Sequence, residues 1–400
     1  MLHVIGGNDV DAADHNMSGV AKLVYAKLVD QLLFADGRRE RGGSGATQRH
    51  FRTPPHCFGY NWTRPIEDSA DALREFVTAL KSKYRRHGGR CDRVVLVTHS
   101  TGGLVARWAC KRADFRADVL GVIHAGVPHR GAPEMYYRFK TGFPRGKVID
   151  TVVAWITARS GDEGTALLGS IPGAIPLLPF GSYRTSDGAA HWLAVERNEG
   201  PEIQRPTTSP YADIYLQRAV WGLVDAHDLD PRRRVDPEQR YRDYRAIVEA
   251  TDAFHRDIEA AGHPNSVNLV SVGVPTAERI ALHATNDPVV VERLRRRGGR
   301  DDTLDRGEFR AVGRLDDGDE TQWAVELQPR TGDGDATVPT VSATQPGVRT
   351  VFVEGVAHAD LLNDRKTHAL VIDEIERMLR AAIDAAMALT GTRGTVGSAP

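Results

Sequence analysis

The sequence has 400 residues, of which 41% are hydrophobic and 26% are charged, and its formal net charge is −1 at pH 7. This length allows a large core, either as one domain with insertions or as two domains. The near-neutral charge argues against nucleic acid as a partner, and no run of about 18 apolar residues would span a membrane. With three widely spaced cysteines and no signal-peptide pattern, we predict a cytoplasmic protein.

The first 130 residues predict alternating strands and helices. In chain order they are a short strand at 2–5, a helix at 14–34, a Gly/Arg-rich loop at 36–50, a strand at 56–62, a helix at 65–87, a strand at 94–97, a helix at 104–110 and a strand at 119–125. This alternation predicts an α/β fold whose mostly parallel sheet has helices on both faces.

The pattern changes between residues 130 and 265, where Pro/Gly-rich linkers surround helical stretches near 212–224 and 237–260. Because this block is too long for a crossover connection, we interpret 131–264 as a largely helical inserted cap. The core is then formed by 1–130 and 265–390, followed by a disordered tail at 391–400. The second core segment predicts a strand at 267–273, a polar excursion at 295–330 with a hairpin around 323–327, a strand at 350–353 and a helix at 367–386.

Ser100 occupies the turn between an apolar strand and an apolar helix. The sequence Thr98-His99-Ser100-Thr101-Gly102 follows the G-x-S-x-G pattern of a nucleophile elbow, except that Thr98 replaces the first glycine. Such a turn projects the serine hydroxyl above the sheet edge and directs the helix N-terminus at a developing oxyanion. We therefore predict Ser100 as a nucleophile and the Thr101 N–H as an oxyanion donor.

Two residues far downstream complete this chemistry. Asp335 precedes the last predicted strand and His358 follows it, which gives the order Ser, Asp, His found in α/β-hydrolases. A serine hydroxyl needs an imidazole to accept its proton, and a buried carboxylate orients that imidazole. The predicted catalytic residues are Ser100, Asp335 and His358.

Several alternatives remain open at this point. Asp335 could only cap a turn, and Asp333 is a competing carboxylate. His368 is a rival base inside the closing helix, whereas His99 is expected to pack on the other side of the elbow. The acidic run at 316–320 lacks the ligand spacing of a calcium loop, so neither a metal nor a cofactor is predicted.

Five segments of the sequence form a recognisable set. They are FGYNW at 58–62, VTHSTGGLVAR at 97–107, GVPHRGAP at 126–133, IPGAIPLLP at 171–179 and GDATVP at 334–339. Together they resemble the lecithin:cholesterol acyltransferase-like lipases of the α/β-hydrolase superfamily. The resemblance covers about 55–185 and 265–380. It implies a serine ester hydrolase or an O-acyltransferase that acts on a lipid-like acyl ester.

The chain departs from that family at three places. Asn61 stands where the family has Asp, Thr98 where it usually has Gly, and the family's leading strand that ends in Pro-Gly-x-x-Gly-Ser has no counterpart. Only Gly6-Gly7 could supply the first oxyanion donor, and we expect the strand at 2–5 to be peripheral and the true start to lie upstream. Losing one donor costs roughly 10²–10³ in rate.

These observations lead to one main interpretation and two alternatives. The main one is a serine carboxylic-ester hydrolase that forms an acyl-enzyme on Ser100 and hydrolyses it with water. The alternatives are acyl transfer to a bound alcohol and a catalytically weak binding protein of the same fold. The predicted partner is the acyl ester or lipid substrate itself.

Overall fold

The structure is a computed structural model that describes residues 2–5, 25–33, 35, 53–142, 161–196, 201–224, 229–230, 234–297, 308–313 and 321–391. The statements below concern these residues. The predicted loop at 36–50, the acidic run at 316–320, the first part of the helix predicted at 14–34 and the predicted tail, apart from residue 391, lie outside them.

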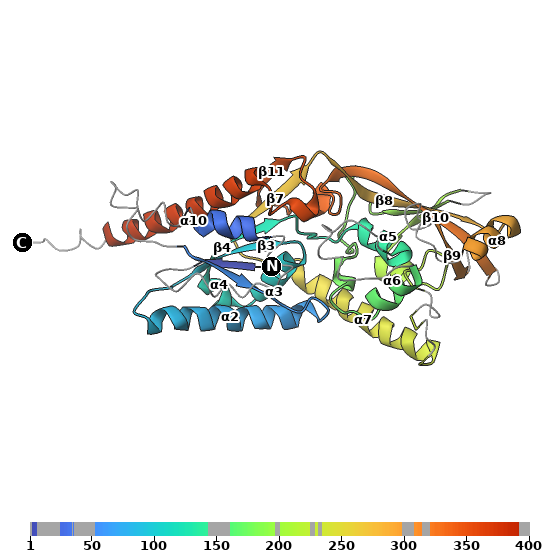
Figure 1. Ribbon diagram of the computed structural model, residues 1–400, viewed down its shortest axis with the longest axis horizontal. Helices are drawn as coiled ribbons and strands as arrows, with labels where there is room; N and C mark the ends of the chain where they lie inside the picture. Colours follow the sequence, from blue (N-terminus) through green and yellow to red (C-terminus); the bar gives the residue numbers. More distant parts are fainter. Residues whose placement is uncertain are drawn as a thin grey trace, which may run out of the picture.

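A six-stranded sheet, here sheet A, forms the core (Figure 1). Its order is β11 (Arg349–Glu354), β7 (Ser266–Val272), β4 (Val119–Ala125), β3 (Val94–His99), β1 (Leu2–Ile5) and β2 (Pro55–Phe58). The four strands from β11 to β3 are parallel, whereas β1 is antiparallel to both of its neighbours. The predicted mostly parallel sheet is therefore confirmed.

Helices cover both faces of sheet A (Figure 1). One face carries α2 (Ile66–Arg86), α3 (Thr101–Ala109) and α4 (Ala113–Asp118), and the other carries the helix at 25–33 and α10 (Arg365–Gly391). Side chains of β3 alternate between the two cores, because Leu96 joins the first cluster and Val95 and Val97 join the second. Within the described ranges, every helix is too short or too polar to cross a lipid bilayer.

The expectation that β1 is peripheral is wrong. This strand lies between β2 and β3, and Leu2 pairs with Thr98 while Ile5 pairs with Val95. Because β1 runs against β3, its carboxyl end lies at the edge of sheet A opposite Ser100. Gly6 and Gly7 are outside the described residues.

A second, five-stranded sheet, here sheet B, was not predicted. Its order is β6 (Ile203–Arg205), β5 (Leu193–Glu196), β8 (Val274–Thr285), β10 (Thr321–Gly334) and β9 (Glu308–Gly313), with α8 (Pro288–Arg297) beside β9 and β10. The predicted hairpin exists as the antiparallel pair β9–β10. However, β10 also pairs along its length with β8, which leaves sheet A directly after β7. The long β8–β10 ribbon therefore returns the chain to the core at Asp335.

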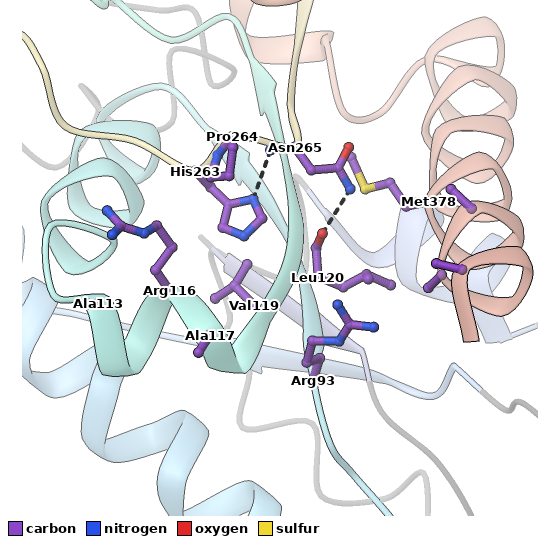
Figure 2. Close-up of a pocket in the computed structure, with 13 residues that line it drawn as sticks. Arg93, Ala113, Arg116, Ala117, Val119, Leu120, His263, Pro264, Asn265 and Met378 are labelled. Atoms are coloured by element: carbon purple, nitrogen blue, oxygen red, sulfur yellow. Dashed lines mark hydrogen bonds between the residues drawn. The ribbon is translucent and has the colours of Figure 1, made fainter. Parts of the chain in front are cut away.

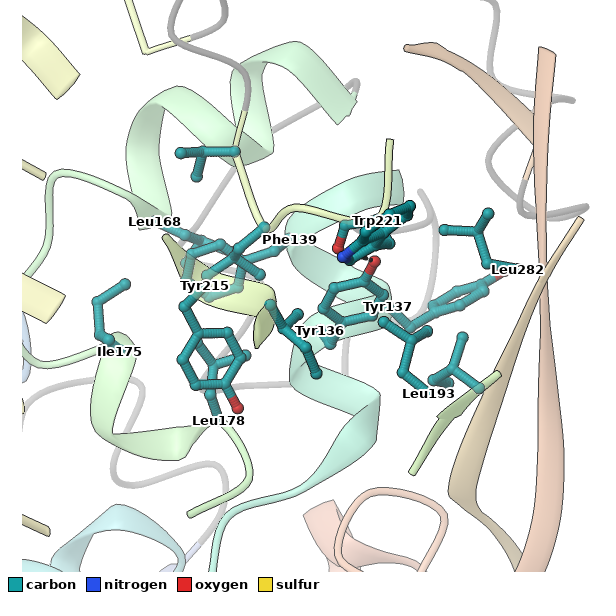
Figure 3. Packing of buried hydrophobic residues seen from close by; sticks show 14 of the residues in the cluster. Tyr136, Tyr137, Phe139, Leu168, Ile175, Leu178, Leu193, Tyr215, Trp221 and Leu282 are labelled. Carbon is teal, nitrogen blue, oxygen red and sulfur yellow. Dashed lines mark hydrogen bonds between the residues drawn. The ribbon is translucent and has the colours of Figure 1, made fainter. Parts of the chain in front are cut away.

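Helical segments of the predicted cap pack against sheet B (Figure 3). They are α5 (Pro133–Thr141), α6 (Gly161–Leu168), η1 (Ile175–Leu177), η2 (Tyr211–Tyr215) and α7 (Pro237–Ile258). The stretch predicted as a helix at 212–224 is a single π-helical turn followed by irregular chain. The division at residue 264 stays a prediction, and sheet B draws strands from both sides of it.

The helix α7 connects the two apolar cores. Its first half contributes Tyr241, Tyr244 and Val248 to the aromatic cluster on sheet B, and its second half contributes Phe254 and Ile258 to the cluster under α2 and α3. A proline at its first position and the Asp236 side chain, which accepts a hydrogen bond from the Gln239 N–H, define its start. This helix therefore spans cap and core as one rigid element.

Candidate active site

Ser100 lies in a strained turn between β3 and α3. Its backbone has φ 53° and ψ −131°, a conformation that L-residues rarely adopt. Two backbone hydrogen bonds stabilise the turn, from Ser100 N–H to the Ala125 carbonyl at 3.1 Å and from Gly103 N–H to the Ser100 carbonyl at 2.9 Å. A Cβ on Gly103 would come within 2.2 Å of Val127. Gly103, the glycine directly after the motif, is therefore required by the close packing of α3 on the chain after β4.

Thr98, the departure from the glycine of the motif, is accommodated by the neighbouring strand. It is fully buried, and its hydroxyl lies 3.1 Å from both the Ile123 carbonyl and His124 Nδ1 on β4. A buried hydroxyl is costly only when it lacks a partner. The threonine is thus compatible with the elbow because β4 supplies its hydrogen bonds.

Asp335 follows the end of β10 directly and is 1% exposed. Its Oδ1 accepts hydrogen bonds from the Thr337 and Val338 N–H groups at 3.0 and 2.7 Å. The neighbouring Ala336 has φ 73°, and its N–H donates to Thr276 Oγ1 on β8 at 2.8 Å. The loop therefore presents Oδ2 in one fixed direction.

His358 lies between this carboxylate and the serine. Its Nδ1 is 2.7 Å from Asp335 Oδ2, and its Nε2 is 3.0 Å from Ser100 Oγ. Because a carboxylate only accepts, Nδ1 carries the hydrogen and Nε2 is left to accept the proton of the serine hydroxyl. The imidazole side chain is 12% exposed, so the group is shielded but reachable.

Gly126, which follows β4, allows the acid and the base to lie so close to the sheet. A Cβ there would come 2.9 Å from Asp335 Oδ2 and 3.2 Å from His358 Nδ1, and the residue has φ 54°. Both the space and the backbone conformation therefore require glycine. This role of Gly126 was not predicted from the sequence, although a glycine directly after a buried strand is a signal that indicates it.

The competing residues lie elsewhere. Asp333 accepts hydrogen bonds from the Gly273 N–H and from Thr340 Oγ1. His368, in the first turns of α10, donates from Nε2 to the carbonyl of Leu362, which precedes that helix, at 3.0 Å. His99 contacts the backbone of His358, because its Nε2 lies 3.0 Å from the His358 carbonyl oxygen.

Thr101, the predicted oxyanion donor, is the first residue of α3 and is 7% exposed. The first amide N–H groups of a helix have no partner within it, and they form the positive end of the helix dipole. The Thr101 N–H is therefore in a suitable position beside Ser100. A second donor from the chain after β1 would need that strand to run the other way.

The segment after β4 fastens the acid loop to the elbow. Arg130 donates from its N–H to Ser342 Oγ at 3.1 Å and from Nη1 to the Val341 carbonyl at 2.9 Å. The His129 N–H donates to the Ser342 carbonyl at 3.0 Å. These acceptors belong to α9 (Thr340–Ala343), which follows Asp335. The segment that resembled the lipase family in the sequence therefore orients the acid loop.

A separate cavity of about 530 Å³ lies at the opposite end of the strands of sheet A, where the parallel strands begin (Figure 2). Arg93, Arg116 and His263 line it together with apolar residues that include Val119 and Met378. Val119 is the first residue of β4, whereas Ser100 follows the last residue of β3. A strand of six residues spans about 20 Å, so this cavity is not part of the site around Ser100.

Comparisons with known proteins address the fold. Residues 60–145 match the family model of the PGAP1-like alpha/beta domain. A chain in the crystal structure of the Tle4–Tli4 complex has a TM-score of 0.65 at 20% identity, and the alignment covers 94% of this chain and 86% of that chain. Phospholipase PlaB from Legionella pneumophila, in complex with thio-NAD, aligns over 84% of this chain and 90% of that chain at 12% identity, but its TM-score of 0.23 carries no argument about the fold. No curated protein matches the sequence.

The matched domain and the superposition agree with the arrangement of sheet A. The family model covers Tyr60 to the start of the cap, which includes α2, the elbow and β4. This family model is that of the PGAP1-like alpha/beta domain, whereas the sequence motifs resemble the lecithin:cholesterol acyltransferase-like lipases. What the motifs, the family model and the superposition share is the architecture. The chain has an α/β-hydrolase-like fold, with Ser100, His358 and Asp335 in hydrogen-bond contact at the carboxyl edge of its parallel strands.

Proposed function

We propose that the protein is a serine carboxylic-ester hydrolase that acts on acyl esters through Ser100, His358 and Asp335. The observation that carries this proposal is the continuous contact from Asp335 Oδ2 through both nitrogens of His358 to Ser100 Oγ. The strained backbone of Ser100 supports it, because strain of about 1–3 kcal/mol is typically retained where function needs it. A purely structural serine has no need of this conformation.

The reaction begins when Ser100 Oγ attacks the ester carbonyl and its proton moves to His358 Nε2. Asp335 stabilises the imidazolium, and the Thr101 N–H donates to the oxyanion. His358 Nε2 then gives its proton to the leaving alcohol as the tetrahedral intermediate collapses to an acyl-enzyme. Water then attacks the acyl carbonyl as His358 Nε2 takes its proton. The Ser100 Oγ–acyl bond breaks, the acid leaves, and His358 returns the proton to Ser100 Oγ.

A lipid-like acyl group is favoured by the surroundings of this edge. The chain passes from β4 through residues 126–132 directly into α5 of the apolar cap cluster. Trp62 follows β2 at the same edge as Ser100, because β2 is parallel to β3, and it packs against that cluster. The resemblance to lecithin:cholesterol acyltransferase-like lipases points to the same substrate class.

The test uses the Ser100→Ala variant and a fluorophosphonate probe. We expect the wild-type protein to be labelled at Ser100 and to hydrolyse p-nitrophenyl esters, with kcat falling about 10⁴–10⁶-fold in the variant. Comparing p-nitrophenyl acetate with the decanoate ester reports the preference for long acyl chains. Activity that persists in Ser100→Ala refutes the proposal. Ester products formed with an added long-chain alcohol would identify acyl transfer in place of hydrolysis.

A further inference from the structure

His99, the residue before the nucleophile, is in direct contact with the residue proposed as the base. Its side chain is 3% exposed, and its ring lies 4.7 Å from the His358 ring, measured between centroids. His99 Nε2 is 3.0 Å from the His358 carbonyl oxygen, and His99 Nδ1 is 3.1 Å from the Tyr25 hydroxyl. Both ring nitrogens are therefore engaged.

The chemistry of these partners determines the tautomer. The His358 carbonyl can only accept, so His99 Nε2 must carry the hydrogen. Burial, and then the proximity of the titratable His358, hold the pKa of His99 well below its usual value, so the ring is neutral and Nδ1 is an acceptor. Burial also raises the pKa of Tyr25, which keeps its hydroxyl protonated as the donor to Nδ1.

We propose that His99 is a positioning residue, which holds the backbone of His358 through its Nε2–H and is itself held by the Tyr25 hydroxyl. This inference rests on the proposed role of His358 as the base. On the other side, the His358 N–H donates to the Asp335 carbonyl at 2.7 Å. The peptide groups flanking the base are thus fixed from both directions, and a shift of about 1 Å in a reacting group can cost 10² in rate.

The neutral state of His99 also matters for the charge that forms during the reaction. His358 becomes an imidazolium in the tetrahedral steps, at a ring separation of 4.7 Å from His99. A second positive charge there would oppose its formation. The arrangement provides a donor to His358 without adding a charge beside it.

Tyr25 brings a distant part of the chain into this arrangement. It is the first described residue of the helix at 25–33, which packs with Leu28 and Leu32 against sheet A and α10 (the blue helix beside α10 in Figure 1). The same apolar cluster contains Val356 and Leu361, which flank His358 in the sequence. The N-terminal helix therefore supports the base through both a hydrogen bond and packing.

The cap contains a matched control. His255 on α7 is also 3% exposed, with Nδ1 hydrogen-bonded to the Tyr211 hydroxyl and Nε2 at 3.1 Å from the Pro176 carbonyl oxygen. The chemistry is the same as at His99, but the carbonyl belongs to a proline in η1 and not to His358. Substitutions at His255 therefore report what the loss of a buried Tyr–His–carbonyl unit does to folding alone.

The experiment compares His99→Gln with His99→Asn. A glutamine amide reaches the position of imidazole Nε2 and keeps the donor to His358, whereas the shorter asparagine amide reaches only the position of Nδ1. We expect His99→Asn to lower kcat about 10- to 100-fold with KM within about twofold, and to slow fluorophosphonate labelling in parallel. His99→Gln should recover kcat to within about fivefold of wild type.

The controls are His255→Asn, His255→Gln and Tyr25→Phe. The His255 variants should keep wild-type kcat at a temperature where they are folded, although they lose thermal stability as the His99 variants do. The inference is overturned if His99→Asn has wild-type kcat, or if His99→Gln and His99→Asn are equally impaired at equal stability. Should neither His99 variant fold, Tyr25→Phe decides, because a fall in kcat of about threefold at constant KM is expected and unchanged kcat contradicts the inference. Activity in Ser100→Ala would refute the proposed function itself, which is a different outcome.

Discussion

Two regions of this molecule contain the same buried Tyr–His–carbonyl unit, and only one of them adjoins a reactive group. At the catalytic edge of sheet A, His99 donates to the carbonyl of His358, which lies between Asp335 and Ser100. At the cap junction, His255 donates to Pro176 and stacks on Phe180 with ring centroids 3.3 Å apart.

The difference between these regions concerns charge. His358 has a carboxylate on one nitrogen and a hydroxyl on the other, and it is partly accessible. Both nitrogens of His255 are bound to uncharged groups, and burial lowers its pKa to about 3. A histidine thus gains acid–base capacity from a partner that stabilises its cation, whereas burial without such a partner makes it a neutral structural group.

Apart from the loss of Ser100 itself, the largest expected effect is the loss of the carboxylate at the catalytic edge. Asp335→Asn should lower kcat/KM about 10⁴-fold, because an amide in place of the carboxylate no longer favours the reactive tautomer or its cation. Asp333→Asn is the matched control, since Asp333 bonds to Gly273 and Thr340 and should retain activity within about threefold. Ester hydrolysis at saturating and limiting substrate measures both. Equal losses in the two variants would contradict the assignment of the acid.

The next effect is a pH dependence of stability that comes from four buried histidines, two of which are His99 and His255. Burial lowers the pKa of His124 and His255 to about 3, and the pKa values of His99 and His129 lie well below the usual value. Below pH 6.5 the unfolded chain therefore binds protons that the native state does not, so stability falls as the pH falls. The four groups together predict a loss of about 5 kcal/mol between pH 7 and pH 5.5.

Urea unfolding at several pH values checks this dependence. His255→Gln should remove about a quarter of the slope, because one of the four groups no longer titrates in the unfolded chain. A free energy of unfolding that stays constant over this pH range would show that the histidines bind as many protons in the native state as in the unfolded chain.

A smaller effect is expected at the cap junction. Arg107 on α3 is 3% exposed and donates to the carbonyl groups of Ile258 and Ala261 at 2.6 and 3.1 Å, at the end of α7. Arg107→Met should lower the free energy of unfolding by about 3 kcal/mol, because these buried acceptors lose their donor. Arg112→Met, at an exposed ion pair with Asp114, should leave the free energy of unfolding close to that of the wild type. If Arg107→Met is as stable as the wild type, α7 is not held in this way.

The smallest effect on stability separates strain from chemistry at the catalytic edge. Ser100→Gly should abolish activity and raise the free energy of unfolding by about 1 kcal/mol, because glycine adopts positive φ without strain. Ser100→Ala should abolish activity without this gain, since alanine keeps the Cβ. Denaturant unfolding of the two variants measures the difference. Equal stability would mean that the elbow stores no strain.

Much of this molecule follows from local sequence patterns. The run from Val94 to His99 and the segment from Val119 to Ala125 are buried strands, because a parallel sheet covered on both faces needs apolar residues at nearly every position. The periodicity at 65–87 and the apolar spacing in the last segment predicted α2 and α10 within a few residues. The tight turn at Ser100 was predicted in the same way, from a serine and glycines between a strand and a helix.

Other features depend on contacts between distant residues. Whether Asp333 or Asp335 faces His358 is decided by the direction in which β10 ends, and this depends on its pairing with β8. The orientation of β1 and the existence of sheet B likewise depend on strand pairing, which local propensity does not specify.

The sequence by itself determined the residue types that the chemistry needs and their order along the chain. The tertiary structure alone decided their contacts: Gly126 beside the Asp335–His358 pair, and His99 between Tyr25 and His358. The physical reason is the distance along the sequence over which each kind of interaction acts. Periodicity and turn chemistry act over a few residues, whereas a hydrogen bond between His99 and His358 joins positions that only the assembled sheet brings together.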